Sequence, residues 1–285
     1  MQITELTIYP VKSLGGIALA SAPLTPKGLA WDRRWMVVDD VGRFVSQRQL
    51  PAMARIRVAL ADDALVLSHP GSEPLRVPLA AEGQPRLSAW VWEDRCDALD
   101  EGAEAAAWLG AVLGGLRGSR LRLVRMAPDH RRRVEPHFLA PGEAAHTAFA
   151  DGYPVLVTTM ASLDALNRRL AAKGLAPVPM SRFRPNLVLA GSEPFAEDGW
   201  RELAAADGRW RLGLRKPCQR CKVTTVDQQS GEIAVPGEPL RTLVEMNRRF
   251  APGGYFGQNA ILLAGEGGCL AVGESLTSTP AASGK

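Results

Sequence analysis

One stretch decides how the rest of this chain is interpreted: Arg215-Lys216-Pro217-Cys218-Gln219-Arg220-Cys221-Lys222-Val223-Thr224-Thr225-Val226-Asp227. It contains two of the four cysteines of the protein, four cations and the start of a β-branched run. A cysteine binds a metal or attacks a substrate as the thiolate, and neighbouring Arg and Lys side chains lower the pKa of a thiol from about 8.5 towards neutrality. The stretch therefore predicts that one cysteine holds a soft metal or takes part in a reaction. The alternative is a pair of inert cysteines beside a solvated basic loop.

The composition of the 285 residues is that of a soluble globular protein with one large domain or two ordinary ones. Hydrophobic residues make up 46% and charged residues 22%, which is enough to fill a core. The net charge of +4 is too small and diffuse to predict nucleic-acid binding, and it indicates local anion-binding patches instead. No apolar run approaches the ~20 residues that span a bilayer, so the sequence predicts no transmembrane segment. The start of the chain resembles a strand and not a signal peptide, and the cysteines are few and scattered, so we expect a reducing, cytoplasmic location.

Short strand-like runs separated by turns dominate the N-terminal part of the chain. Asp39-Asp40-Val41-Gly42 lies between two apolar runs and predicts a hairpin. An alanine-rich segment at residues 103–113 predicts the first helix, and Gly114-Gly115 ends it at a domain boundary. Strands at such short intervals are typical of a sandwich or a barrel. They are expected at residues 3–11, 17–24, 28–45, 55–60, 64–68, 75–79 and 121–125.

The second part mixes strands with helices, so the whole protein is predicted to be mainly β with some helices, of the α+β class. Strands are expected at residues 154–159, 187–190, 210–214, 221–226, 259–263 and 269–272, and helices at residues 162–170 and 239–250. The small polar residues from Ser275 to Lys285 predict a disordered tail. Residues 127–152 lack periodicity and contain Arg131-Arg132-Arg133, which indicates a docking surface or lid or, alternatively, a solvated excursion.

The Cys-x-x-Cys spacing alone fits the common cysteine sites poorly. A zinc site needs four ligands, and neither a second cysteine pair nor nearby histidines complete one. A thioredoxin-like site lies at the N-terminus of a helix, whereas residues 222–226 are β-branched and favour a strand. The common glycine-rich phosphate-binding signatures are absent. Zinc is therefore disfavoured, and a redox disulfide remains an alternative.

Three other short segments place cations where they could bind an anion. Lys12 and Ser13 follow a strand and precede two glycines, so ammonium, hydroxyl and backbone N–H groups could hold an anion there. Arg33 shares one face of a predicted strand with Trp35. Arg184 and Asn186 precede an apolar strand and could grip an anionic or heterocyclic ligand. For each of these, an ordinary exposed side chain is the alternative.

Five short segments follow one another along the chain: Tyr-Pro-Val-Lys-Ser at 9–13, Asp-Arg-Arg-Trp at 32–35, Phe-Arg-Pro-Asn at 183–186, Cys-Gln-Arg-Cys-Lys-Val-Thr-Thr-Val-Asp at 218–227 and Phe-Gly-Gln-Asn at 256–259. In this order they resemble the MOSC family in its two-part form, and most of all the amidoxime-reducing components and their bacterial relatives. The resemblance implies a MOSC N-terminal β-barrel domain over residues 1–118 and a MOSC β-barrel domain over residues 119–276. Residues 277–285 would then form the disordered tail.

The resemblance also implies that the protein binds molybdenum cofactor, a pterin dithiolene that carries molybdenum and a terminal phosphate. Cys221 is the implied metal ligand and catalytic residue, and a soft thiolate suits a soft metal. Cys218 is then a packing residue beside the ligand. The implied contacts to the phosphate and the pterin are Lys12, Ser13, Arg33, Asp151, Gly152, Tyr153, Arg184, Asn186, Gln219, Arg220 and Asn259.

The implied reaction is the two-electron, two-proton reduction of an N–OH or N-oxide group in a small molecule. Asp227 is a candidate acid, although an aspartate before Gln-Gln-Ser-Gly is typical of a turn. The chain contains no cysteine after position 276, so we expect no iron–sulfur cluster in it. Electrons are then expected from a separate electron-transfer protein, such as an acidic ferredoxin, flavodoxin or cytochrome steered by Arg131-Arg132-Arg133. Two alternatives stay open: a non-catalytic cofactor carrier or sulfur-transfer module, and a Cys-x-x-Cys thiol redox protein.

Overall fold

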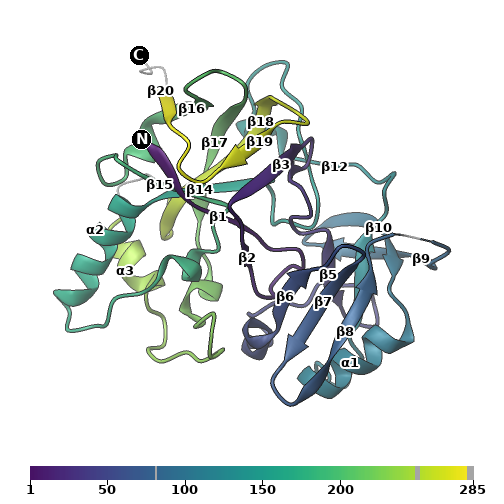
Figure 1. The fold of residues 1–285 in the computed structure, drawn as a ribbon. Helices are drawn as coiled ribbons and strands as arrows, with labels where there is room; N and C mark the ends of the chain where they lie inside the picture. The colour runs from purple at the N-terminus through teal and green to yellow at the C-terminus, as the bar shows by residue number, and fades with distance from the viewer. Residues whose placement is uncertain (81, 248–250, 281–285) are drawn as a thin grey trace.

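The computed structural model describes residues 1–80, 82–247 and 251–280, and it shows two β-rich lobes that lie side by side (Figure 1). One lobe is built on an eight-stranded sheet, and the other on a four-stranded and a three-stranded sheet. The prediction of a mainly β protein with some helices is confirmed. None of the helices in the described ranges has the length and apolar character needed to cross a membrane.

The eight-stranded sheet takes strands from both ends of the chain, in the order β2-β1-β15-β14-β18-β17-β16-β20. Strands β14 and β15 are parallel and are joined through helix α2 (Met160–Ala171), as a crossover requires, while the other neighbours are antiparallel. Because β1 pairs with β15, the first residues of the chain fold together with its second half. The strands are β1 (Gln2–Ile8), β2 (Ile17–Ala18), β14 (Val155–Thr159), β15 (Leu187–Ala190), β16 (Trp200–Ala205), β17 (Arg211–Gln219), β18 (Tyr255–Ala264) and β20 (Leu276–Pro280).

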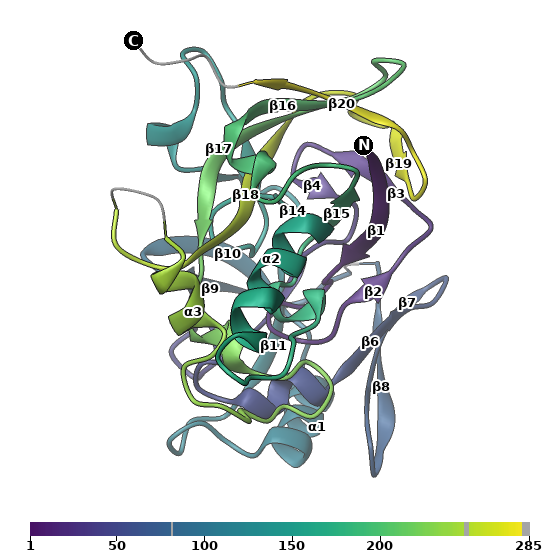
Figure 2. The same ribbon diagram turned by 90° about the vertical axis from the view of Figure 1, so that its left-hand side faces the viewer.

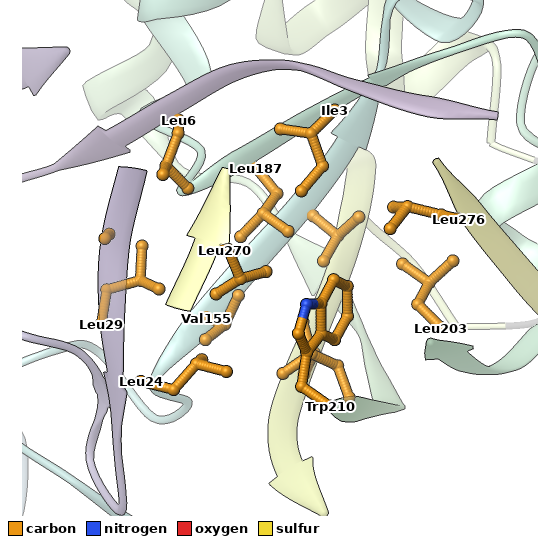
Figure 3. Close-up of a cluster of buried hydrophobic side chains, with 14 of the residues drawn as sticks. Ile3, Leu6, Leu24, Leu29, Val155, Leu187, Leu203, Trp210, Leu270 and Leu276 are labelled. Carbon is orange, nitrogen blue, oxygen red and sulfur yellow. The ribbon is translucent and has the colours of Figure 1, made fainter. Parts of the chain in front are cut away.

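A hydrophobic core lies on one face of this sheet, where side chains from distant segments converge around Trp210 (Figure 3). Ile3, Leu187 and Leu203 meet there, together with Leu270 from a smaller sheet. That smaller sheet pairs β19 (Cys269–Ala271) with β3 (Ser21–Thr25), which in turn pairs with β4 (Gly28–Leu29). The core therefore fixes the segment that precedes the Asp-Arg-Arg-Trp motif against the second half of the chain.

Helices α2 and α3 (Leu240–Glu245) cover the opposite face of the sheet (Figure 2). Strand alternation explains this arrangement, since Leu187 and Leu189 of β15 enter the first core while Val188 packs against the helices. Thr159 begins α2 by accepting a hydrogen bond from the backbone N–H of Ser162. A stacked pair of aromatic rings, Phe183 and Phe256, lies 4.0 Å apart in this second core.

The other lobe contains the four-stranded sheet β5-β11-β10-β9, the three-stranded sheet β6-β7-β8 and helix α1. Leu109 of α1 packs with Trp35 of β5 and Leu65 of β7 in its core. The alanine-rich segment forms α1 at the predicted residues, between Gly102 and Gly114. The elements are β5 (Trp35–Val38), β6 (Arg57–Leu60), β7 (Ala64–His69), β8 (Ser72–Pro78), β9 (Arg86–Val91), β10 (Asp94–Asp100), α1 (Ala103–Leu113) and β11 (Arg122–Met126), with a two-stranded ribbon of β12 (Arg132–Arg133) and β13 (His146–Thr147) beyond them.

The predicted division near residue 118 stays a prediction. Strand β1 lies in the eight-stranded sheet, while β11, which follows residue 118, pairs with β5 and β10 in the four-stranded sheet. Short 3-10 helices connect several elements, namely η1 (Pro51–Arg55), η2 (Pro136–Phe138), η3 (Met180–Phe183), η4 (Ala196–Gly199) and η5 (Lys222–Thr225).

Several sequence predictions were wrong in detail, and each has a physical reason. The β-branched run after Cys221 forms η5 and not a strand, because the hydroxyls of Thr224 and Thr225 donate to carbonyls three residues earlier. Arg33 lies in a turn with a left-handed backbone, so it does not alternate with Trp35 along a strand.

The predicted tail is also corrected, because β20 pairs along β16 and buries Leu276 in the main core. Residues 281–285 of that tail lie outside the described residues, as do residues 248–250 of the predicted second-half helix, of which α3 is the described part. Strand β16 itself was not predicted, although Leu203 and Ala205 alternate into the core.

Candidate functional site

The candidate site lies between the lobes, where loops that follow β1, precede β5 and flank β15 meet the cysteine stretch. Lys12 marks one side of it and is buried, with only 6% of its surface exposed. Its Nζ donates to the carbonyl of Phe149 at 2.8 Å and contacts Asp151 Oδ1 at 2.6 Å. Burial lowers the pKa of Lys12, while the charge of Asp151 acts in the opposite direction. Lys12 is therefore not an ordinary exposed loop lysine.

Two arginines enclose the ring of Tyr9 in the centre of the site. The guanidinium carbons of Arg33 and Arg184 lie 4.4 and 4.2 Å from the ring centroid. Arg33 Nη1 donates to both carboxylate oxygens of Asp32, at 2.7 and 2.6 Å, and to Asn186 Oδ1 at 3.1 Å. The segments at 9–13, 32–35 and 183–186 thus come together through direct side-chain contacts.

Burial dominates the electrostatics of this centre. It raises the pKa of Asp32, although Arg33 acts to lower it, and it raises the pKa of Tyr9 to about 12. Burial also lowers the pKa of Arg184 to about 10, and the charge of Arg33 adds to this shift. The Arg184 guanidinium donates one hydrogen bond within the described residues, to Gln228, so its other N–H groups are available to an anionic ligand.

Three candidate cofactor-binding residues have left-handed backbones, which are uncommon for residues other than glycine. The φ angles are 70° at Ser13, 47° at Arg33 and 53° at Arg184. Such conformations cost free energy and are concentrated at functional sites.

The two cysteines of the Cys-x-x-Cys stretch have different neighbours, and neither is in a disulfide. Cys218 Sγ accepts a hydrogen bond from Arg220 Nη1 at 2.8 Å, and Arg220 Nη2 donates to the Phe183 carbonyl. Cys221 is half-buried at the start of η5, with its Sγ 3.9 Å from Nη1 of Arg48. Cys221 is thus the cysteine that faces the lobe built on the four-stranded and three-stranded sheets, the N-terminal lobe.

A pair of glutamines, which the sequence analysis did not identify, connects the lobes beside Arg184. The side-chain amides of Gln47 and Gln228 exchange hydrogen bonds of 3.0 and 2.9 Å. Gln47 also donates to the Ser13 carbonyl at 2.8 Å, and Gln228 accepts from Arg184 Nη1 at 3.0 Å. A cavity of about 420 Å³ opens next to this pair, lined by Tyr9, Arg184, Gln228 and residues of both lobes.

The described residues contain no group of three or more His, Cys, Asp or Glu side chains that could hold a metal ion. A metal at Cys221 would therefore need most of its ligands from a bound group that carries its own donors. A dithiolene cofactor has such donors, and a buried nitrogen without a partner, Arg220 Nε, lies within the cysteine stretch. The residues present fit a group that combines soft sulfur ligands with an anionic part.

Several predicted site residues lie away from this centre, and their roles stay predictions. Tyr153 packs in a separate cluster with Val134 and Ile261. The Gln219 amide donates to the carbonyl of Pro252 at 3.2 Å, and Asn259 lies on β18 opposite Leu156 and Lys216. Gly152 is half-buried beside Asp151.

The run at 131–133 is not a continuous exposed surface, which corrects the prediction for its central residue. Arg132 is buried, pairs with Asp94 at 2.7 Å and donates to the carbonyls of Ala148, Ala150 and Asp151. It holds the loop that carries Asp151, while Arg131 and Arg133 remain exposed.

Other site residues were missed by the sequence analysis for identifiable reasons. Tyr9 and Asp32 lie inside the segments at 9–13 and 32–35, but neither carries the positive charge that predicts an anion-binding site there. Gln47 and Arg48 belong to no recognised motif, and their contacts to Gln228 and Cys221 span well over a hundred positions. The signal that could have found them is a polar run, Ser46-Gln47-Arg48-Gln49, directly after a buried strand-like segment.

Comparison with known families agrees with this arrangement. Residues 1–115 match the MOSC N-terminal beta barrel domain, and residues 144–277 match the MOSC domain. The chain therefore belongs to the MOSC family, in the form that carries the N-terminal domain.

Curated relatives match most of the chain. Mitochondrial amidoxime-reducing component 1 of Mus musculus is 34% identical over 247 residues, which cover 85% of this chain and 70% of that protein. The human component 1 is 34% identical over 252 residues with the same coverage. Molybdenum cofactor sulfurase of Danio rerio is 33% identical over 260 residues, which cover 85% of this chain but only 30% of the sulfurase.

Proposed function

We propose that this protein binds molybdenum cofactor and reduces N-hydroxylated or N-oxide compounds in the cytoplasm, with electrons from a separate carrier protein. The observation that carries the proposal is the half-buried Cys221, whose Sγ lies 3.9 Å from Arg48 Nη1, where the described residues offer no cluster of His, Cys, Asp or Glu side chains that could hold a metal by themselves. The similarity to amidoxime-reducing components over most of both chains supports it.

Different residues of the site would bind different parts of the proposed cofactor. The phosphate and the pterin would be held by Lys12, Ser13, Arg33, Arg184 and Asn186, and the metal by Cys221. The remaining predicted contacts are Asp151, Gly152, Tyr153, Gln219, Arg220 and Asn259. When bound, the cofactor supplies a metal that exchanges two electrons, and the protein orients the ligands and balances their charge.

The proposed reaction converts an N–OH group, two electrons and two protons into an N–H group and one water molecule. Asp227 is a poor source of these protons in this structure. Its Oδ1 accepts from the backbone N–H groups of Gln229 and Ser230, and its Oδ2 pairs with Arg182. Hydrogen bonds from these N–H groups lower the pKa of Asp227, so it serves as the turn-closing residue.

Metal analysis of purified protein from a cofactor-competent host tests the proposal. We expect about one molybdenum per chain in the wild type and in Cys218→Ser, and a loss of molybdenum in Cys221→Ser, because only Cys221 is proposed to ligate the metal. Cys218→Ser is a matched control within the same stretch. Absence of molybdenum from the wild type, or equal loss in both variants, would contradict the proposal.

The similarity to a molybdenum cofactor sulfurase favours one second candidate, a non-catalytic cofactor carrier or sulfur-transfer module. An assay with an amidoxime and an artificial electron donor separates the two. Turnover that depends on bound molybdenum supports the reductase, whereas molybdenum without turnover supports the carrier. A Cys-x-x-Cys redox function is less well supported, because Cys218 and Cys221 bind different arginines.

A further inference from the structure

An aromatic and cationic cluster of the N-terminal lobe, formed by Phe44, Arg48 and Trp92, borders Cys221. The rings of Phe44 and Trp92 meet edge to face with centroids 5.1 Å apart. The guanidinium of Arg48 lies 4.3 Å from the Trp92 ring and 5.4 Å from the Phe44 ring. Its Nη1 is the group that lies 3.9 Å from Cys221 Sγ. The cluster is therefore a wall of the site supplied by the other lobe.

Arg48 differs from Lys12 and Arg33 in forming no ion pair among the described residues, although its charge acts on Asp151 and lowers the pKa of that carboxyl. Lys12 pairs with Asp151 and Arg33 with Asp32, but Arg48 forms no ion pair within the part of the chain that the structure describes. Its Nε donates to Ser46 Oγ at 3.3 Å, and its Nη2 has no hydrogen-bond partner among the described residues. The rings fix the guanidinium plane, so an unused donor is held beside the thiol.

Trp92 is the exposed member of the cluster. The turn between β9 and β10 holds its backbone at a φ of 57°, and 44% of the residue is exposed although Phe44 and Arg48 contact the ring. An exposed indole held at an uncommon backbone angle beside Arg48, which itself contacts Cys221, is a stacking surface for a planar group. Cations lie over Phe44 and Trp92, so a neutral planar group suits this surface better than a positively charged one.

We propose that this cluster is the substrate-binding wall of the site. Arg48 donates to the oxygen of the N–OH group, and Trp92 stacks on the planar aryl part of the substrate. The inference rests on the proposed reductase function and names the side chains that would bind the N–OH group and the aryl part of its substrate.

Trp92→Ala and Trp92→Phe test the stacking role with two substrates, benzamidoxime and acetamidoxime. Trp92→Ala is expected to raise the KM for benzamidoxime about fivefold to tenfold with little change in kcat, because a stacked pair is lost. The KM for acetamidoxime, which has no ring to stack, should change less than about twofold. Trp92→Phe should restore most of the benzamidoxime affinity.

Trp31→Ala is the matched control. Trp31 is also an exposed tryptophan with a left-handed backbone, with 38% exposure and a φ of 66°, but its ring lies over Trp35 and not over a cation. This variant should leave the ratio of the two KM values unchanged. A Trp92→Ala protein that behaves like Trp31→Ala would overturn the stacking role.

Arg48→Lys tests the oxygen contact, because lysine keeps the charge but loses the planar donor fork. With rates expressed per bound molybdenum, kcat/KM should fall about 10- to 100-fold for both substrates, since both carry the N–OH group. Arg133→Lys, at an exposed position, is the control. An Arg48→Lys protein with unchanged kcat/KM would overturn this role.

Equilibrium dialysis of benzamidoxime without an electron donor separates this inference from the proposed function. Binding to the wild type that weakens in Trp92→Ala and not in Trp31→Ala supports the wall even if no turnover occurs, in which case the reductase function alone fails. If turnover and binding are the same in the wild type and in Trp92→Ala, the reductase function stands and the proposed substrate-binding role of the cluster is contradicted.

Discussion

Two groups of buried charges in this molecule are built in opposite ways. In the N-terminal lobe, Arg125 donates to both carboxylate oxygens of Glu101 and to the carbonyls of Pro78 and Leu79. In the site, the Arg184 guanidinium donates one hydrogen bond within the described residues, to Gln228, and stacks on Tyr9. The first arrangement gives every nitrogen of the guanidinium a hydrogen-bond partner, whereas the second keeps donors available. The difference shows that the hydrogen bonds a buried arginine makes within the protein, more than its burial, distinguish a structural arginine from a ligand-binding one.

The largest expected loss of stability follows from removing Arg125, the cation of the buried ion pair in the N-terminal lobe. Arg125→Met should lower the free energy of unfolding by about 3–5 kcal/mol, because Glu101, of which 1% of the side chain is exposed, would stay buried without a cation. Urea unfolding followed by circular dichroism measures the change.

Arg76→Met is the control, since the pair of Arg76 and Asp63 is exposed by 58% and 82%. An exposed pair of this kind contributes at most about 1 kcal/mol. Equal losses in the two variants would show that the satisfied network in the N-terminal lobe has no special role.

Glu197 extends the comparison to a buried acid without a cation. It is fully buried, its Oε2 accepts from Thr159 and Ser162, and its Oε1 has no partner. Burial raises the pKa of Glu197. A raised pKa means that the folded state holds the proton more tightly, so this group stabilises the fold below its ordinary pKa and loses that contribution as the pH rises through the folded pKa.

Glu197→Gln removes the titration and should therefore gain stability relative to the wild type as the pH rises from about 4.3, by up to about 1.4 kcal/mol per pH unit until the folded pKa is passed. Urea unfolding at a series of pH values from acidic to neutral tests this. Parallel stability curves for variant and wild type would contradict it.

The sequence predicted the architecture where local pattern and packing agree. The alanine-rich run became α1 because Gly102 and Gly114 stop it on both sides. The sequence-based prediction was wrong at residues 222–226, where the hydroxyls of Thr224 and Thr225 bond to the backbone and prevent a strand. It was also wrong for the polar segment that contains Leu276, because the burial of this one residue holds the segment against the core. Propensity over a short window does not record either contact.

Within the site, the motifs predicted which segments meet but not how each residue is used. Lys12, Arg33 and Arg184 come together around Tyr9 and Asp151. Arg132 was predicted to be part of an exposed basic run and is buried, while Arg48 belongs to no recognised motif and contacts Cys221. Burial and long-range contact are properties of the fold, and charge along the sequence does not show them.

The smallest expected effect on stability is at Arg184, and it is the sharpest test of the comparison. Arg184→Met should change the free energy of unfolding of the cofactor-free protein by less than about 1 kcal/mol or increase it, because no carboxylate is left unpaired and a poorly compensated buried cation is removed. The same variant should lose molybdenum on purification if Arg184 binds the cofactor, which metal analysis measures. Retained molybdenum together with a loss of stability like that of Arg125→Met would place Arg184 among the structural groups. A small change in the free energy of unfolding together with a large loss of bound molybdenum is expected of a cation whose partner is the ligand.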